Sequence, residues 1–354
     1  MEPNRQKPGF FSRSGVRIVL TIIIGVGLII SVLDIRKILS LVEKIEFVPL
    51  FLSFVTAALS YLFLGLALNK LLELVGERLS FKDMFAISWV STSLNNLFST
   101  GGVAGLTMRV FLLRRKNISF SDTFLVSFVH TLLINGVLIG FVMFGFGYLL
   151  TSANLRLYQY LISSGVLIFT LTLAFLATGS VIDRPFRERF IDFFYSLTNW
   201  LSFKFTKRLL FKKAQLDEFK AEFHQGISLM LSHKGRILLP AFYVFLDWLA
   251  CLLTLYFGFL AIGYPISPGI LVVGFAIGIF VPLISFIPGA IGIMEGSMAA
   301  IYYSLNVPPE VAIVAVLLYR GVLHIFPFVT STLLYRPLFR EAKAIRTGQL
   351  PEAP

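Results

Sequence analysis

The sequence has 354 residues, of which 56% are hydrophobic and 14% are charged, and its mean hydropathy is +0.83. In soluble domains about a quarter of all residues are charged, so this composition excludes an ordinary soluble protein. The net charge of +12 needs no nucleic-acid partner, because the cations gather at the ends of apolar runs. Cys251 is the single cysteine, which excludes an internal disulfide and leaves no cysteine cluster for a metal. We expect it to be a small packing residue.

Long apolar runs in the sequence predict six membrane-spanning helices, since each run approaches or exceeds the roughly 20 residues that cross a bilayer. The predicted spans are 17–34, 47–69, 121–150, 157–182, 237–262 and 311–335. The first run is not followed by a small-residue cleavage site, so we interpret it as a retained span rather than a signal peptide.

The lysines and arginines divide unequally between the two sides of these spans. Four of them, Arg36, Lys37, Lys44 and Arg156, fall on one side, Arg320 falls inside a span, and the rest of the 31 fall on the other side. Cationic loops favour the cytoplasm. We therefore expect a multi-pass protein of the cell (cytoplasmic) membrane with both termini and residues 183–236 on the cytoplasmic side.

Two further apolar segments must return to the side from which they start if this charge balance is to hold. Residues 83–113 would enter from the cytoplasmic side and residues 269–305 from the outer side, with glycine-containing breaks at 99–105 and 286–292. Paired, interrupted segments of this kind are typical of inverted-repeat transporters with a binding site at the midplane. The predicted fold is an all-α polytopic bundle, one domain over 1–354, with six spans and two oppositely oriented re-entrant hairpins.

The segment 183–236 alternates aromatic and basic residues at helical spacing between 186 and 232, which predicts one or two amphipathic helices. Two interpretations stay open for it. It could be a scaffold beneath the bundle, or its cations could attract anionic lipid head groups.

Polar residues at bilayer depth are costly and mark candidate sites. The second limb of each hairpin would begin at glycines, where free N–H groups and the helix dipole favour an anion such as a lipid phosphate. Arginines would add charge-assisted contacts, and carboxylates would balance them or bind an ammonium group. The candidate substrate-binding residues are Asn95, Asn96, Gly101, Gly102, Arg109, Asp247, Pro288, Gly289, Gly292, Glu295 and Arg320.

Structural roles compete with these assignments. Arg109 could extend to the membrane interface, Glu295 and Arg320 could form an ionic bridge between helices, and Asn95 and Asn96 could cap freed backbone groups. For His130 and His324 we expect hydrogen-bonded packing roles. The sequence contains no phosphate-binding loop, no histidine or cysteine metal spacing and no Gly-x-Ser-x-Gly elbow, so we expect no ATP motor, metal, cofactor or catalytic residue.

Three motifs resemble a known family. They are the Asn-rich, Gly-rich stretch from Ser93 through Arg109, the stretch Phe286-Ile-Pro-Gly-Ala-Ile-Gly-Ile-Met-Glu-Gly, and the Leu-Tyr-Arg that ends at Arg320. In this order they resemble the transmembrane-domain family of lysylphosphatidylglycerol synthase/flippase proteins, also called multiple peptide resistance factors. The resemblance covers nearly the whole chain. This chain departs from the family's pattern at Ser99 or Thr100, Ala290 and Val129-His130.

The resemblance implies a lipid-flipping membrane domain, without the soluble synthase domain that full-length members carry. We therefore expect an ATP-independent, non-enzymatic flippase or scramblase-like lipid transporter. Its expected partners are anionic or aminoacylated phospholipids or polyprenyl-phosphate-linked lipids, and a separate lipid-synthesising enzyme could accompany it. The alternatives are an intramembrane enzyme that acts on a lipid head group, with Glu295 or Asp247 as base, and a non-catalytic partner of such a synthase.

Overall fold

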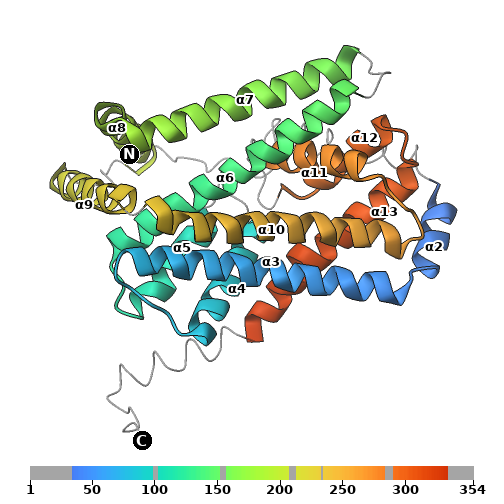
Figure 1. The fold of residues 1–354 in the computed structure, drawn as a ribbon, viewed down its shortest axis with the longest axis horizontal. Coiled ribbons are helices and arrows are strands. Elements are labelled where there is room, and N and C mark those ends of the chain that lie inside the picture. The colour runs from blue at the N-terminus through green and yellow to red at the C-terminus, as the bar shows by residue number, and fades with distance from the viewer. Residues whose placement is uncertain are drawn as a thin grey trace, which may run out of the picture.

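The computed structural model of the protein describes residues 34–98, 103–151, 157–206, 213–232, 234–283 and 290–333. Over these ranges every regular element is a helix (Figure 1). The elements are α2 (Ile35–Glu43), α3 (Phe47–Leu74), α4 (Phe81–Phe98), α5 (Val103–Arg114), α6 (Phe120–Thr151), α7 (Leu157–Ile182), α8 (Arg184–Thr206), α9 (Lys213–Ser232), α10 (Lys234–Ala261), α11 (Pro268–Leu283), α12 (Ile293–Ser304), α13 (Pro309–Arg320) and the π-helical turn η2 (Gly321–Ile325). The all-α prediction is confirmed.

Four helices in these ranges are long and apolar enough to cross a bilayer. They are Phe47–Leu74, Phe120–Thr151, Gly235–Ala261 and Pro309–Leu333, and each coincides with a span expected from the sequence. The helix α7 has the expected bounds, with a shorter apolar stretch at Leu167–Leu176, and its crossing stays a prediction. Of the expected span 17–34, all but Asp34 lies outside the described residues.

The helices α3 and α10 form the most extensive helix pair of the bundle, and a polar seam runs between them. Small polar side chains recur every three or four residues on both: Ser53, Thr56 and Ser60 on α3, and Asp247, Cys251 and Thr254 on α10. The Thr56 and Thr254 hydroxyls are 2.9 Å apart, and the Ser53 hydroxyl donates to the Thr254 carbonyl at 3.1 Å. Such bonds between membrane helices stabilise by about 0.6–2 kcal/mol each.

Two pairs of short helices occupy the positions of the expected hairpins. The helix α4 packs against α5, and α11 packs against α12. Both contacts depend on glycine: a Cβ on Gly105 would overlap Asn95, and Cβ atoms on Gly274 and Gly278 would overlap Tyr302 and Met298. A Gly-x-x-x-Gly spacing of this kind lets helix backbones approach closely.

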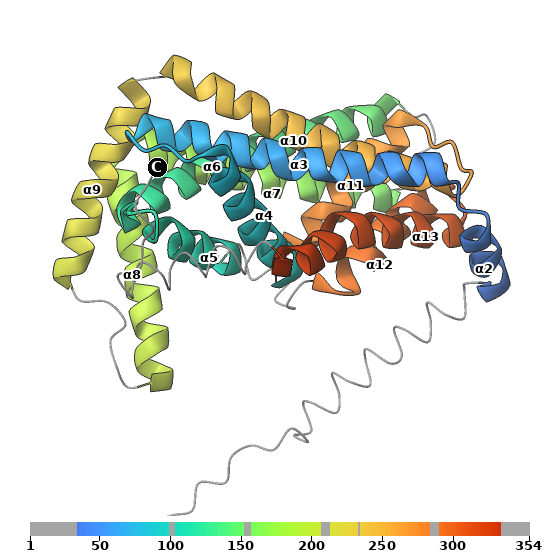
Figure 2. The same cartoon turned by 90° about the horizontal axis from the view of Figure 1, so that it is seen from below.

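The two pairs lie in opposite halves of the bundle. Both views show α4 and α5 beside the end where α3 finishes, and α11 and α12 in the half next to α2 (Figures 1 and 2). The helices α5 and α12 have 12 residues each, about 18 Å at 1.5 Å per residue. This is well short of the hydrocarbon thickness of about 30 Å, so neither can span alone.

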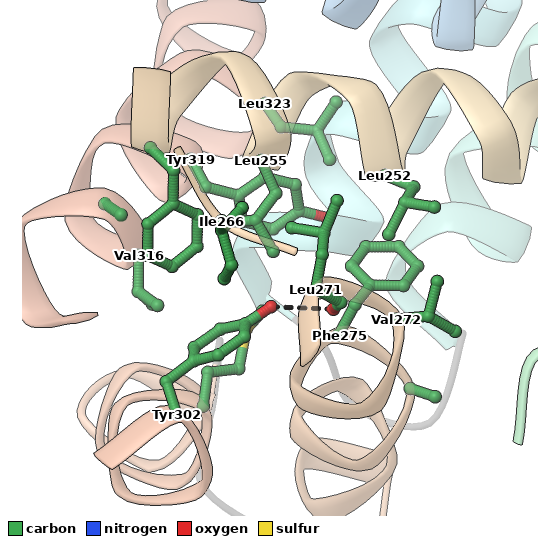
Figure 3. Packing of buried hydrophobic residues seen from close by; sticks show 14 of the residues in the cluster. Leu252, Leu255, Ile266, Leu271, Val272, Phe275, Tyr302, Val316, Tyr319 and Leu323 are labelled. Atoms are coloured by element: carbon green, nitrogen blue, oxygen red, sulfur yellow. Dashed lines mark hydrogen bonds between the residues drawn. The ribbon is translucent and has the colours of Figure 1, made fainter. Parts of the chain in front are cut away.

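An apolar core joins α10, α11, α12 and α13 (Figure 3). Leu255 and Phe275 are completely buried in it, and so is Tyr302, whose hydroxyl donates to the Leu271 carbonyl at 2.9 Å. Because that bond satisfies the phenol, the large ring can occupy the core without an orphaned polar group. The core continues through Tyr319 and Leu323 to the wall of a cavity.

The segment expected to be amphipathic forms two helices, α8 and α9, that cross one end of the bundle (Figure 2). On α9, Phe223 and Ile227 are buried, and the Phe223 ring meets those of Phe124 and Phe128 on α6. On α8, apolar rings such as Trp200 are exposed. The helix α9 therefore packs against the bundle, and both a scaffold role and contact of α8 with a lipid surface stay predictions.

Candidate functional site

A cavity of about 470 Å³ lies where the two helix pairs approach each other. The ends of both pairs line it, through Asn95 and Gly105 on one side and Ile279, Ala290 and Met294 on the other. Helices α3, α6, α10 and α13 complete its wall. The volume falls within the roughly 300–1,000 Å³ of typical ligand sites.

Arg109 of α5 lines this cavity beside α6. Its Nη1 lies 3.3 Å from the Ser127 hydroxyl, to which it donates, and 3.5 Å from Nδ1 of His130. Along the described ranges no carboxylate lies within 4 Å of it. Arg109 therefore belongs to the cavity wall, and its extension to the membrane interface, the competing interpretation, stays a prediction.

Asp247 of α10 lines the same cavity and is 5% exposed. The Ser60 hydroxyl donates to its Oδ1 at 2.5 Å, and the Cys251 thiol lies 3.7 Å from the same oxygen. No lysine or arginine from the described segments forms an ion pair with it. A carboxylate without a cation is expensive to bury, because desolvation is not offset by a partner charge.

Several buried polar atoms around the cavity have no hydrogen-bond partner among the residues that the structure describes. They are Asn95 Oδ1, Arg109 Nε, His130 Nε2, Trp248 Nε1 and His324 Nδ1, and all five residues line the cavity. Three of these side chains are more than nine-tenths buried: His130, Trp248 and His324. Orphaned buried polar atoms are uncommon and each costs about 1–3 kcal/mol, so their concentration makes this cavity the candidate site.

His324 reaches the cavity from a π-helical turn, η2, that interrupts the last long helix. The Tyr61 hydroxyl donates to the Leu323 carbonyl at 2.9 Å and so satisfies a backbone group at the irregular turn. The Asn96 amide in turn donates to the Tyr61 hydroxyl at 3.3 Å. Turns of this kind inside α-helices occur frequently at functional sites.

Glu295 and Arg320 lie close together but outside the set of described residues that line the cavity. Arg320 Nε and Glu295 Oε1 are 2.9 Å apart in a buried ion pair. The other oxygen, Glu295 Oε2, accepts the Gly292 backbone N–H at 2.8 Å, and Arg320 Nη1 lies 3.6 Å from the sulfur of Met294. This geometry is that of an ionic bridge that fixes α12 on α13, and a ligand-binding role for either residue stays a prediction.

The remaining predicted residues divide between described and undescribed parts of the chain. Gly101, Gly102, Pro288 and Gly289 lie outside the described residues. Asn96 lines the cavity, and Gly292 precedes the first residue of α12 with φ +80°. Ala290, where the resemblance to the family implies glycine, lines the cavity with φ +44°, a backbone region that glycine adopts without strain.

The structure adds wall residues that the sequence interpretation missed: Ser60, Ser91, Thr92, Ser127, Trp248 and Cys251. Cys251, expected to be a packing residue, lies 3.3 Å from the Ser60 hydroxyl within the polar seam. The spacing of the polar residues in α3 and α10 could have revealed Ser60 and Cys251. Polar residues every three or four positions within two apolar spans indicate that the two helices share a polar interface.

Residues 18–331 match the family model for the lysylphosphatidylglycerol synthase TM region. The chain belongs to this family. It is similar to a UPF0104 membrane protein of Pyrococcus horikoshii, at 26% identity over 318 residues, which are 85% of this chain and 91% of the relative. A UPF0104 membrane protein of Methanocaldococcus jannaschii is 20% identical over 299 residues, 82% of this chain and 84% of the relative.

Membership in this lysylphosphatidylglycerol synthase TM family confirms the resemblance drawn from the three motifs. With four helices able to cross a bilayer, it makes this chain a membrane protein of a lipid-related family. The matched residues include every helix from α2 to η2, and so the whole described wall of the cavity.

Proposed function

We propose that this protein is an ATP-independent lipid transporter that moves a lipid with a phosphate-containing head group between the two leaflets. The observation that carries the proposal is the polar cavity inside an apolar helical bundle, with Arg109 and orphaned buried polar atoms in its wall. A guanidinium binds phosphate oxygens by charge-assisted hydrogen bonds, which supply the affinity that a lipid head group needs away from water.

The two helix pairs line the route that the lipid head group takes through the protein. In this proposal α4–α5 is a re-entrant hairpin from the cytoplasmic side and α11–α12 is one from the outer side. The first turns of α5 and α12 border the cavity through Gly105, Leu106 and Met294. The N-terminal dipole of α5 favours an anion at that point, whereas at the start of α12 Glu295 already accepts the N–H of Gly292. The head group passes between the hairpins while the acyl chains remain in the surrounding lipid.

Such a transporter needs no fuel to equilibrate lipid. It needs two access states that differ in which leaflet reaches the cavity, and a head group that binds to both. Glycine contacts at Gly105, Gly274 and Gly278 let each hairpin move as a close-packed unit. The combination favours rocking of the hairpins about the rigid α3–α10 pair.

The test is leaflet exchange in liposomes that contain the purified protein and a trace of fluorescent phosphatidylglycerol. A membrane-impermeant quencher destroys the fluorescence of the outer leaflet, and the slower loss reports lipid arriving from the inner leaflet. We expect the protein to accelerate that loss over protein-free liposomes. Lack of acceleration with phosphatidylglycerol, an aminoacylated phospholipid and a polyprenyl phosphate would rule the transporter out.

Thin-layer chromatography of lipid from the same vesicles separates this function from a lipid-modifying enzyme. We expect the lipid to be recovered unchanged. New head-group products would instead indicate an intramembrane enzyme. Unchanged lipid without exchange would favour a non-catalytic partner of a separate synthase.

A further inference from the structure

Two opposite charges in the cavity wall do not neutralise each other directly. Arg109 on α5 and Asp247 on α10 both line the cavity, and they form no ion pair. Separated in this way, each remains available to a ligand. Without a head group, the protonated Arg109 and the ionised Asp247 together give the cavity a net charge of zero. The bundle can then change its access state without moving charge across the membrane.

An anionic head group disturbs this balance. A phosphodiester brings one negative charge, and with Arg109 and an ionised Asp247 the cavity would then hold a net charge of about minus one within apolar walls. One proton removes the excess. A proton on Asp247 also turns a group that repels the phosphate into an O–H that can donate to a phosphate oxygen. The loaded cavity is then neutral, like the empty one.

The other titratable side chains around Asp247 are less suited to receive this proton. Those on the packed elements are Tyr61 on α3, Arg109 on α5, His130 on α6, Cys251 on α10, Tyr319 on α13 and His324 on η2. Protonation of His130 would place a second cation 3.5 Å from Arg109. His324 follows Arg320 by four residues and is repelled by that guanidinium, but less than His130 is by Arg109, because Arg320 is paired with Glu295. Tyrosine and cysteine release a proton to become charged and cannot take one up to cancel an anion.

We propose that Asp247 is the coupling site of a proton symporter, at which one proton binds together with one anionic phosphate-bearing head group and crosses with it. This inference rests on the proposed function. The proton comes from water on the side where the head group enters, forms an O–H bond with a carboxyl oxygen of Asp247, and returns to water on the other side. No bond of the lipid is made or broken. The Ser60 hydroxyl, which donates to Asp247, holds the carboxyl in place in both protonation states.

The experiment uses liposomes with the full chain, a pH difference across the membrane and a potassium ionophore to clamp the voltage. Fluorescent phosphatidylglycerol at trace level reports the ratio between leaflets at steady state. One proton per lipid predicts an accumulation of about tenfold per pH unit in the leaflet that faces the alkaline side. This readout depends on coupling and is independent of the rate of transport.

Matched variants locate the proton. In Asp247→Asn the ratio should return to one at any gradient, whatever the rate, because the amide cannot bind and release a proton. His130 and His324 line the cavity, so His130→Gln and His324→Gln can change the rate of exchange, but at steady state they should keep the tenfold ratio. If a histidine variant loses the ratio and Asp247→Asn keeps it, the assignment to Asp247 is wrong. A wild-type ratio of one with accelerated exchange overturns the coupling and leaves the transporter function standing.

If the wild-type protein gives no exchange at all, the proposed function fails, and proton binding is then tested without transport. Infrared difference spectra of the purified protein are recorded on addition of a short-chain phosphatidylglycerol. Proton uptake at Asp247 predicts a new band of a protonated carboxyl that is missing in Asp247→Asn. A wild-type spectrum without that band overturns the inference.

Discussion

Arg109 connects the sequence motif to the chemistry of the cavity most directly. It follows the Gly-rich break, borders the cavity and contacts Ser127 and His130, yet it forms no ion pair with a carboxylate in the described part of the chain. An arginine kept in this state at bilayer depth costs stability unless an anion is its intended partner. At the residue scale, the phosphate-binding proposal therefore depends first on this side chain.

Replacement of Arg109 by alanine should slow exchange of anionic lipid by about 10- to 100-fold, since a hydrogen bond to a charged group contributes about 1.5–3 kcal/mol. The liposome assay measures it. Arg114, exposed on the same helix, provides the matched control, and Arg114→Ala should leave exchange unchanged. Equal rates for Arg109→Ala and wild type would remove Arg109 from the binding site.

The bridge between Glu295 and Arg320 makes a different prediction, about stability. Arg320→Met leaves a buried carboxylate without its cation and should lower the free energy of unfolding by about 3–5 kcal/mol. The double variant Glu295→Gln/Arg320→Met should recover part of that loss. Thermal unfolding in detergent, followed by fluorescence, measures both.

The exposed pair Arg184–Glu188 is the control for this bridge, because water screens it. Its loss in Arg184→Ala should change stability by less than about 1 kcal/mol. If Arg320→Met were as stable as wild type while lipid exchange stopped, the ionic bridge would be wrong and direct substrate binding by Arg320 would be favoured.

At the scale of the elements, the pair α11–α12 depends on two glycines one helical turn apart. Gly274 contacts the buried ring of Tyr302, and Gly278 contacts Met298. A methyl group at either position would push α12 away from α11 and disturb the cavity wall at Met294. The Gly-x-x-x-Gly spacing is evident in the sequence, but only the fold shows that α12 packs against these glycines.

Gly274→Ala should therefore destabilise the protein by about 1–3 kcal/mol, the usual cost of overpacking. Gly140→Ala in α6 is the matched control, because a Cβ there would meet nothing within 4 Å and alanine is the better helix former. Its stability should be unchanged or slightly increased. Thermal unfolding compares them, and equal stability of the two variants would contradict a close glycine contact.

At the scale of the whole molecule, the open question is which side of the membrane each hairpin enters. The structure places α4–α5 and α11–α12 in opposite halves of the bundle (Figure 2). Since α5 and α12 are too short to cross alone, the two ends of each hairpin should lie on the same side of the membrane.

Single cysteines in a Cys251→Ala background test this topology with an impermeant maleimide applied to cells or to inverted vesicles. Cysteines at Arg78 and Arg114, which flank α4–α5, should react from the cytoplasmic side. Cysteines at Ser267 and Pro308, which flank α11–α12, should react from the outer side. Reaction of Arg78→Cys and Arg114→Cys from opposite sides would mean that this pair crosses the membrane.

The sequence by itself determined the membrane class, the helical content and the family. It also placed four of the spans and both helix pairs close to their observed bounds. These features follow from local physics, because an apolar run of sufficient length can satisfy its backbone in lipid only as a helix. Charge at the ends of the runs added a predicted orientation. Asn95, Asn96, Arg109 and Asp247 were selected because ionisable and amide groups are rare at bilayer depth.

Only the tertiary structure decided how these groups meet. Arg109 and Asp247 are 138 positions apart in the sequence, and their common cavity arises because α5 and α10 pack around the same space. Glu295 and Arg320 are likewise ionisable residues within apolar segments. Their helices bring them together as an ion pair, 2.9 Å apart, outside the described cavity wall. Spacing along one helix determines which residues share a face, whereas the partner of that face depends on the packing of distant segments.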